Sequence, residues 1–280
     1  MQIRQILKVA IKELSNQRAP SLDARLLLCA TMEYTHEELL LNYNQELTPA
    51  EEKEFMALVS RRKSSEPLAY ILGQQEFYGL ELRIDRNVLI PRPETELLID
   101  LVLNDPLPHN KTIKILDLGT GSGAISIALA KHIQAASITA TDISKQALEI
   151  AKINAEIHDV SGQINFRISD WYDQLGEAKY DYIISNPPYI AKSEQDQMAK
   201  ETLLFEPELA LYAPEEGLAA YKSIINAASQ HLKPGGRLLL EIGYSQKNAI
   251  ISILSANGFK NTRTHQDLAG LDRVIMAKMR

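Results

Sequence analysis

The first seventy residues carry apolar positions at helical spacing. Residues three and four apart form one hydrophobic stripe near the start of the chain, made of Ile3, Ile6, Leu7, Ala10, Ile11 and Leu14. Residues 21–31 supply a second stripe, and both patterns are typical of helices that bury one face. A further helix begins after Thr48, where threonine can cap the first turn, a proline occupies the first helical position and Glu51 can complete a capping box. We expect this helix to run to about Lys63, within a small helical domain over residues 1–72.

A different pattern follows residue 73. Polar and apolar residues alternate from residue 76 to residue 90 around Asp85-Arg86-Asn87. Alternation over such a short stretch is typical of half-buried strands joined by a turn. We therefore predict a β-hairpin linker over residues 73–92, with its turn at Asp-Arg-Asn.

From residue 113 onward, short apolar runs alternate with helical stretches. The strand-like runs are residues 113–118, 137–142, 163–168, 180–185, 237–243, 260–265 and 273–278. Strands that alternate with helices indicate an α/β fold with a parallel sheet. We expect this domain to span residues 93–280.

Three glycines in five residues directly follow the first of these strands. Gly119-Thr120-Gly121-Ser122-Gly123 leads into apolar residues at helical spacing, which predicts a strand, a tight turn and a helix. Glycine adopts positive φ readily and lets a ligand approach backbone N–H groups at the start of a helix. The spacing Gly119-x-Gly121-x-x-Ala124 also satisfies the loose dinucleotide fingerprint, so a dehydrogenase is a competing interpretation.

The next two strand ends carry an acidic and an aromatic side chain. Asp142 lies about 20 positions beyond the glycines, where a carboxylate can accept hydrogen bonds from ribose hydroxyls. A role as the cap of the helix over residues 144–157 is compatible with that. Trp171, the single tryptophan, follows the third strand. We expect it to stack on an adenine or to form a pocket wall, although tryptophan is also an ordinary packing residue.

Asn186-Pro187-Pro188-Tyr189 follows the fourth strand. A pair of prolines after a strand is commonly just a stop signal for the sheet. An asparagine side-chain carbonyl and the backbone carbonyl of a proline are also two acceptors on one rigid corner, and together they suit a planar NH2 group. Ligands of open parallel sheets bind outside the carboxyl ends of the strands. We therefore expect the glycines, Asp142, Trp171 and this corner to line one cleft.

The glycine turn, the acidic strand end and Asn-Pro-Pro-Tyr together resemble the Rossmann-like S-adenosylmethionine-dependent methyltransferases, and the last motif is similar to that of members that methylate planar nitrogens. With Pro91-Arg92-Pro93-Glu94-Thr95-Glu96 and the helical region ahead of it, the whole chain resembles the protein release factor glutamine N5-methyltransferases. The resemblance implies a Rossmann-like seven-stranded sheet, mostly parallel with an antiparallel C-terminal strand. It also implies that the helical N-terminal domain recognises the substrate.

The resemblance further implies a reaction. A methyl group would pass from S-adenosyl-L-methionine, which becomes S-adenosyl-L-homocysteine, to the glutamine N5 in the Gly-Gly-Gln loop of peptide chain release factors, without a metal. Asn186 and Pro187 would each accept one N–H of the amide and hold its nitrogen in line with the methyl group. Pro188 would keep the corner rigid, and Tyr189 would pack against the amide plane.

The resemblance assigns cofactor contacts to several residues. These are Gly119, Thr120, Gly121, Ser122, Gly123, Asp142, Trp171 and Asn186. The glycines would pass close to the methionine part of the cofactor. Asp142 would hold the ribose, and Trp171 would border the adenine.

Composition limits the partners. With 280 residues and 45% hydrophobic content, the chain can bury a full core and a small second domain. Its net charge of -6 gives no general attraction for nucleic acid. The start of the chain has no secretory pattern, and we expect a cytoplasmic monomer that contacts neither membrane nor nucleic acid. The one cysteine, Cys29, excludes an intramolecular disulfide and a cysteine-cluster metal site.

Three other functions remain open. An adenine-N6 or guanine-N2 methyltransferase is the nearest, because the same corner can hold an exocyclic base amine, but it needs basic and aromatic surfaces for a flipped base. A dehydrogenase needs a catalytic acid-base residue, and none of the 6 histidines lies beside the glycines or Asn186 in the sequence. A cofactor-binding adaptor without activity is disfavoured by the intact motifs.

Some charged segments have two interpretations each. Arg92, Glu94 and Glu206 are candidates for the edge of the pocket, or for ion pairs that order loops. Residues 191–214 are polar and acidic with few element signals, and we expect a lid or recognition loop there. The cluster Arg61-Arg62-Lys63 indicates a solvated helix end that complements the helix dipole.

Overall fold

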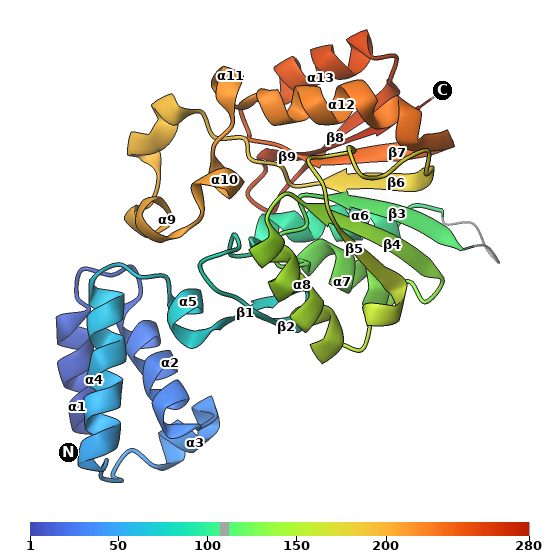
Figure 1. Ribbon diagram of the computed structural model, residues 1–280. Helices are drawn as coiled ribbons and strands as arrows, with labels where there is room; N and C mark the ends of the chain where they lie inside the picture. The colour runs from blue at the N-terminus through green and yellow to red at the C-terminus, as the bar shows by residue number, and fades with distance from the viewer. Residues whose placement is uncertain (107–111, 280) are drawn as a thin grey trace. The chain divides into compact units, whose positions relative to one another are not determined.

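The computed structural model describes residues 1–106 and 112–279, and the chain forms two compact units (Figure 1). The helical unit contains Met1–Gln74 and Ala199–Phe205, and the sheet unit contains Gln75–Met198 and Glu206–Arg280. The helical unit therefore includes a segment from the middle of the chain as well as its start. The predicted division into a recognition domain, a linker and a catalytic domain stays a prediction.

Helices build the helical unit. They are α1 (Ile3–Glu13), α2 (Pro20–Met32), α3 (His36–Leu41), α4 (Pro49–Lys63), α5 (Leu68–Leu72) and α9 (Lys200–Phe205). At the start of α4, the Thr48 hydroxyl accepts from the Glu51 N–H at 3.3 Å, and the Glu51 carboxylate accepts from the Thr48 N–H at 2.6 Å. The predicted helix and its capping box are confirmed. The predicted stripe on α1 faces the core of the unit, where most of its members are buried.

Arg62 forms the centre of a buried polar cluster in the helical unit. Its guanidinium donates to the Asp23 carboxylate at 2.7 Å, to the Glu201 carboxylate of α9 at 2.7 Å and to the Glu66 carbonyl at 2.9 Å. Only 7% of the Arg62 side chain is exposed. The prediction of a solvated helix end is therefore wrong for Arg62, because its guanidinium is paired with acids inside the helical unit. The ion pair with Glu201 also binds α9 to this unit.

A short hairpin opens the sheet unit. Strands β1 (Gln74–Phe77) and β2 (Leu80–Arg83) form a two-stranded sheet. Tyr78 and Gly79 make the turn, with φ of 53° and 73°, and two residues at positive φ suit a tight hairpin turn. The hairpin prediction is correct in kind, but its turn at Asp85-Arg86-Asn87 is wrong, because Gly79 supplies the backbone conformation that the shorter connection requires.

A seven-stranded sheet follows, with the order β5-β4-β3-β6-β7-β9-β8. Its strands are β3 (Ile113–Leu118), β4 (Ala136–Asp142), β5 (Ile164–Ile168), β6 (Tyr180–Ser185), β7 (Leu232–Glu241), β8 (Lys260–Gln266) and β9 (Asp272–Lys278). The pairs from β5 to β7 are parallel, whereas β9 runs antiparallel to both β7 and β8. The predicted α/β fold with a mostly parallel Rossmann-like sheet is confirmed.

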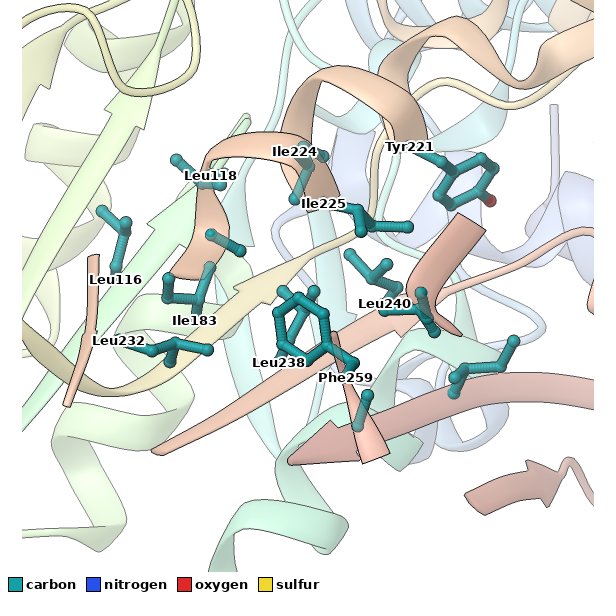
Figure 2. Packing of buried hydrophobic residues seen from close by; sticks show 14 of the residues in the cluster. Leu116, Leu118, Ile183, Tyr221, Ile224, Ile225, Leu232, Leu238, Leu240 and Phe259 are labelled. Carbon is teal, nitrogen blue, oxygen red and sulfur yellow. The ribbon is translucent and has the colours of Figure 1, made fainter. Parts of the chain in front are cut away.

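Helices cover both faces of this sheet. On one face, α12 (Ala219–His231) and α13 (Lys247–Ala256) bury side chains of the central strands, as Figure 2 shows for Tyr221 and Ile224 of α12 against Leu238 and Leu240 of β7. On the other face, α6 (Glu96–Leu103), α7 (Ala124–His132) and α8 (Lys145–Ile157) contact one another in turn (Figure 1). None of the helices that the structure describes is long and apolar enough to cross a membrane.

Short helices occupy the segment that was expected to be a loop. Residues 191–214 contain the 3-10 helix η3 (Lys192–Gln197), then α9, α10 (Glu208–Leu211) and the start of α11 (Pro214–Gly217). The prediction of a loop with few elements is wrong here, because each of these helices has four to six residues. Such short helices show little periodicity and depend on tertiary contacts.

Replacement of Arg62 tests the buried polar cluster. The Arg62→Ala variant leaves the Asp23 carboxylate buried without its partner, and we expect a loss of about 3 kcal/mol in unfolding free energy. Urea unfolding followed by circular dichroism measures it. Lys63→Ala is the matched control on the same helix, because Lys63 and Glu13 form an exposed pair with 58% and 41% of their side chains accessible. Equal midpoints for the two variants would contradict this interpretation.

Candidate functional site

A cavity of about 360 Å³ lies at the carboxyl ends of the central strands. Six of the residues singled out in the sequence line it, namely Gly119, Gly121, Asp142, Trp171, Asn186 and Pro188. They come from the ends of β3, β4, β5 and β6, and the chain order of these strands reverses between β3 and β6. A crevice at such a switch point is the usual ligand site of an open α/β sheet.

The glycine turn after β3 uses positive φ at all three glycines. The angles are 72° at Gly119, 55° at Gly121 and 83° at Gly123. A Cβ atom on Gly121 would have no other heavy atom within 4 Å, whereas one on Gly123 would lie 3.1 Å from the Cβ of Ala151 in α8. Gly121 therefore leaves room beside the cavity, and Gly123 allows α7 to pack closely on α8.

The fully buried carboxyl group of Asp117 stabilises the glycine turn. The Asp117 side chain accepts from the Thr120 hydroxyl at 2.6 Å and from the Ser126 hydroxyl at 2.7 Å. Burial raises the pKa of Asp117 to about 6, and the two hydroxyl donors oppose that shift. Asp117 thus ties the turn to the first residues of α7.

Asp142 binds two backbone N–H groups at the end of β4. Its carboxylate oxygens accept from Gly121 at 2.9 Å and from Ser144 at 2.9 Å. A carboxylate offers about four lone-pair positions, so acceptor positions remain for hydroxyl groups of a ligand. Burial raises the pKa of Asp142, and the N–H donors lower it. The alternative role as a helix cap is wrong, because Ser144 caps α8 through the Ala147 N–H at 3.1 Å.

Trp171 forms a wall of the cavity beside the glycine turn. Its indole ring lies 4.0 Å from the position that a Cβ on Gly119 would take. The backbone at Trp171 has a φ of 46°, and the Ser169 hydroxyl donates to the Trp171 carbonyl at 3.0 Å. Part of the side chain also packs on the core cluster. The residue therefore combines the two roles that the sequence left open, a cavity wall and a packing residue.

Asn186 belongs to a chain of three side chains. Its Nδ2 group donates to the Thr95 hydroxyl at 3.1 Å, and that hydroxyl donates to the Glu241 carboxylate at 2.6 Å. Thr95 is 4% exposed and Glu241, the last residue of β7, is 1% exposed. Burial raises the pKa of Glu241 to about 7, while the Thr95 hydrogen bond and Arg273 oppose that shift. The amide of Asn186 thus has its NH2 group engaged, which leaves Oδ1 as its acceptor.

The Tyr189 end of the Asn-Pro-Pro-Tyr corner is also held by hydrogen bonds and close packing. The Gln246 side chain donates to the Tyr189 carbonyl at 2.9 Å and accepts from the Gly243 N–H at 3.1 Å. Gly217 lies against the same carbonyl so closely that a Cβ atom there would come within 2.1 Å of it. Burial raises the pKa of Tyr189 to about 12, so its ring stays neutral. The corner is therefore held at both ends.

The segment after the corner closes one side of the cavity. Pro207, Leu209 and Ala210 line it. Glu206, almost fully buried, pairs with Arg92 and accepts from the Ile90 N–H at 3.2 Å. These contacts favour the loop-ordering role for Arg92 and Glu206 over a role at the pocket edge. Glu94 is exposed, and its role stays a prediction.

An isolated parallel β-bridge between Ile190 and Tyr212 also holds this segment in place. The Ile190 N–H donates to the Leu211 carbonyl at 3.0 Å, and the Ala213 N–H donates to the Ile190 carbonyl at 3.0 Å. The residue after Tyr189 is thereby paired with the far end of α10. The wall of the cavity and the Asn-Pro-Pro-Tyr corner form one hydrogen-bonded assembly.

Some predicted site residues do not line the cavity. Thr120 directs its hydroxyl to Asp117, the Ser122 carbonyl accepts from Asn154 at 2.9 Å, and Gly123 serves helix packing. Pro187 and Tyr189, which neighbour the lining residues Asn186 and Pro188 in the chain, do not line the cavity either. The roles assigned to all of these residues stay predictions.

The sequence interpretation missed Thr95, Glu241 and the apolar contacts of the cavity. Thr95 is inside the Pro-Arg-Pro-Glu-Thr-Glu segment, and Glu241 is a charged residue in an otherwise apolar strand run. The charge of Glu241 within an apolar strand is a signal that the sequence offers, because a charged residue in a buried strand normally has a partner. Ile143, which lines the cavity, is an exposed apolar residue directly after Asp142.

The cavity suits a ligand with several chemical parts. Its volume is within the range of about 300–1,000 Å³ that is usual for small-molecule sites. Asp142 would supply acceptors for sugar hydroxyls, Trp171 and Ile143 would supply apolar walls for a planar base, and the turn at Gly121 leaves room for a chain. These residues fit S-adenosylmethionine. Residues 1–106 and 112–279 contain no group of three or more His, Cys, Asp or Glu side chains that could hold a metal ion.

Comparisons with protein families agree with this architecture. Residues 95–214 match the family model described as the methyltransferase small domain, and residues 5–73 match the model described as the PrmC N-terminal domain. Among solved structures, a methyltransferase from Pyrococcus furiosus has a TM-score of 0.52 and 18% sequence identity, covering 80% of this chain and 96% of that chain. That likeness shows the fold.

Curated relatives are closer in sequence. The release factor glutamine methyltransferase of Coxiella burnetii is 41% identical over 277 residues, which is 97% of this chain and 98% of the relative. The bifunctional methyltransferase of Rickettsia typhi is also 41% identical, over 98% of this chain but 56% of its own length. The chain thus spans about half the length of the bifunctional relatives and nearly the full length of the other.

Two alanine substitutions in the glycine turn test its geometry. Both Gly121→Ala and Gly123→Ala place a side chain at positive φ, which costs about 1–2 kcal/mol. Gly123→Ala also forces a methyl group against Ala151 of α8, and overpacking of this kind adds about 1–3 kcal/mol. We expect Gly123→Ala to lower the urea midpoint more than Gly121→Ala does. The opposite order would show that the turn does not set the spacing of α7 and α8.

Proposed function

We propose that this chain, which belongs to the release factor glutamine methyltransferase family, transfers a methyl group from S-adenosylmethionine to a glutamine side-chain nitrogen of a peptide chain release factor. The acceptor is N5 of the glutamine in the Gly-Gly-Gln loop. The observation that carries the proposal is the orientation of the Asn186 amide at the cavity. Its NH2 group is bound by Thr95, so its carbonyl oxygen is left to accept from a substrate NH2 group.

The weak nucleophile explains why two acceptors are needed. The lone pair of an amide nitrogen is delocalised into its carbonyl group, and the site has no need of a strong base acting first. Asn186 Oδ1 and the Pro187 carbonyl each accept one N–H of the substrate amide and orient its nitrogen toward the methyl donor. Both oxygens also stabilise the positive charge that develops on nitrogen as the new bond forms. The nitrogen then releases one of its two protons to solvent, which leaves a neutral methylated amide.

The remaining cavity residues bind and orient the methyl donor. S-adenosylmethionine supplies an activated methyl group when bound, so that the proposed reaction needs no metal. Asp142 would accept from the ribose hydroxyls, and Trp171 and Ile143 would enclose the adenine. Gly119 and Gly121 would let the methionine part lie close to the backbone of the turn. Tyr189, which stays neutral, would pack on the amide plane of the substrate.

We assign substrate recognition outside the cavity to the helical unit. A folded protein substrate that contacts a second surface presents its loop at a raised effective concentration. The match of residues 5–73 to a separate N-terminal family model supports a unit with its own role. A release factor as substrate would place the reaction in the cytoplasm, and we propose that the enzyme works there as a monomer.

Methyl transfer to purified substrates tests the proposed function. The protein is incubated with S-adenosylmethionine labelled in the methyl group and with a release factor, a release factor whose Gly-Gly-Gln glutamine is replaced by alanine, or nucleic acid. We expect label in the first protein alone, located on its glutamine by mass spectrometry. Label in nucleic acid would favour the base-amine reaction, and no label in any acceptor would favour an adaptor; either result overturns the proposal.

Removal of the Asn186 side chain tests its role in the chemistry. We expect Asn186→Ala to lower kcat by about 10²-fold or more, by analogy with the loss of one preorganised polar contact. Affinity for S-adenosylhomocysteine, measured by calorimetry, stays nearly unchanged. Asn226→Ala, at an exposed position of α12, is the matched control and keeps normal turnover. Near-normal single-turnover rates for Asn186→Ala would remove Asn186 from the reaction.

A further inference from the structure

Three side chains from distant parts of the chain meet beside the cavity. Thr95 lies just ahead of α6, Asn186 follows β6 and Glu241 ends β7. The Asn186 Nδ2 group is 3.1 Å from the Thr95 oxygen, and that oxygen is 2.6 Å from the Glu241 carboxylate. Thr95 and Glu241 are both almost fully buried, so water does not compete for these hydrogen bonds.

The Glu241 carboxylate fixes the direction of the hydrogen bonds from Asn186 through Thr95 to Glu241. An ionised carboxylate can only accept, and a threonine hydroxyl has a single proton to donate. With Glu241 ionised, that proton is committed to Glu241, so the Thr95 oxygen can only accept from Asn186. The amide must then present its NH2 group to Thr95, which directs Oδ1 to the other side.

Protonation of Glu241 removes this constraint. A protonated carboxyl group can donate to Thr95, whose own proton is then free to point at Asn186. The amide can turn over, with Oδ1 toward Thr95 and its NH2 group toward the cavity. Two NH2 groups would then face each other where the substrate amide needs an acceptor.

We propose that Thr95 and ionised Glu241 are positioning residues that hold the Asn186 amide with its oxygen toward the substrate. This inference rests on the proposed function for its reaction, but its hydrogen-bond geometry does not depend on the identity of the substrate. Thr95 transmits the orientation, and the charge of Glu241 sets its direction. Neither residue contacts the reacting nitrogen.

The surroundings of Glu241 define the pH range in which the orientation holds. Burial raises the pKa of its carboxyl group to about 7, so that its protonated form is populated below neutrality. The charged and titratable groups that act on it, among the described residues, are Arg92 and Glu94 from the segment before α6, Arg273 of β9, Tyr189 after β6 and Tyr221 of α12. The hydroxyl of Tyr221 in α12 donates to the Glu241 backbone carbonyl at 2.9 Å. We expect kcat to rise with pH as Glu241 ionises.

Two substitutions at Thr95 separate the hydroxyl from the shape of the side chain. Thr95→Val has the same shape without the hydroxyl, and Thr95→Ser keeps the hydroxyl. We expect Thr95→Val to lower kcat by about tenfold to hundredfold, which corresponds to one misdirected buried hydrogen bond, with KM for the methyl donor unchanged. Thr95→Ser should restore most of the activity. Wild-type kcat in Thr95→Val, or an equal loss in Thr95→Ser, overturns the proposal.

A double variant tests whether Thr95 acts through Asn186. If it does, Thr95→Val combined with Asn186→Ala turns over no more slowly than Asn186→Ala alone, because the interaction is already lost. A purely structural role for Thr95 gives losses that multiply. A double variant whose loss of kcat equals the product of the two single losses would therefore contradict a role of Thr95 through Asn186.

Glu241→Gln tests the charge independently of Thr95. The glutamine has the same shape and does not titrate, so the rise of kcat with pH near neutrality should disappear in this variant. An unchanged profile overturns the role of Glu241. Nuclear magnetic resonance of the Asn186 side-chain NH2 group gives a readout without any substrate: we expect its signals to shift in the wild type as Glu241 titrates and to stay fixed in Glu241→Gln. Because this measurement uses no substrate, its outcome is independent of whether the protein methylates a release factor.

Discussion

The parallel pairing of β3 and β6 determines the geometry of the site. Leu118 pairs with Ser185 in this register, and the Ser185 hydroxyl donates to the Leu118 carbonyl at 2.7 Å. The next residue of each strand is a predicted site residue, since Gly119 begins the glycine turn and Asn186 begins the Asn-Pro-Pro-Tyr corner. A shift of one residue would turn the side chains of β6 to the opposite faces of the sheet. In the proposed reaction, this pairing places the residues that would bind the methyl donor next to those that would bind the acceptor amide.

Buried carboxyl groups at two strand ends organise the site around that pairing. Asp117 near the end of β3 holds the glycine turn, and Glu241 at the end of β7 acts on the corner through Thr95. Burial raises the pKa of both groups, which means that ionising them costs the folded state free energy. Stability therefore falls as the pH rises from the ordinary range of a carboxyl group to these raised values. Both carboxyl groups orient neighbouring hydroxyl groups. The second oxygen of Asp117 is buried and has no hydrogen-bond partner among the described residues, so the arrangement of this part of the network rests on one carboxyl oxygen.

The parts of the site that could be predicted from the sequence are those encoded locally. The glycine turn, Asp142 and Asn-Pro-Pro-Tyr each follow a recognisable strand, so their convergence on one edge follows from the parallel fold. Thr95 could not be assigned in this way, because its partner Glu241 lies 146 positions away. The burial of Arg62 could not be predicted for the same reason, since the acids that pair with it come from residues 23 and 201. The position of the hairpin turn could not be predicted, because alternation of polar and apolar residues identifies strands better than it identifies the residues between them.

A crystal structure with S-adenosylhomocysteine and a Gly-Gly-Gln peptide shows where the substrate glutamine lies relative to the Asn-Pro-Pro-Tyr corner. We expect the glutamine nitrogen to lie within hydrogen-bond distance of Asn186 Oδ1 and the Pro187 carbonyl, with Asn186 Nδ2 still on Thr95. We also expect the ribose hydroxyls to lie on Asp142. A glutamine bound away from the corner, or an Asn186 amide whose NH2 group faces the peptide at a pH where Glu241 is ionised, would contradict the account.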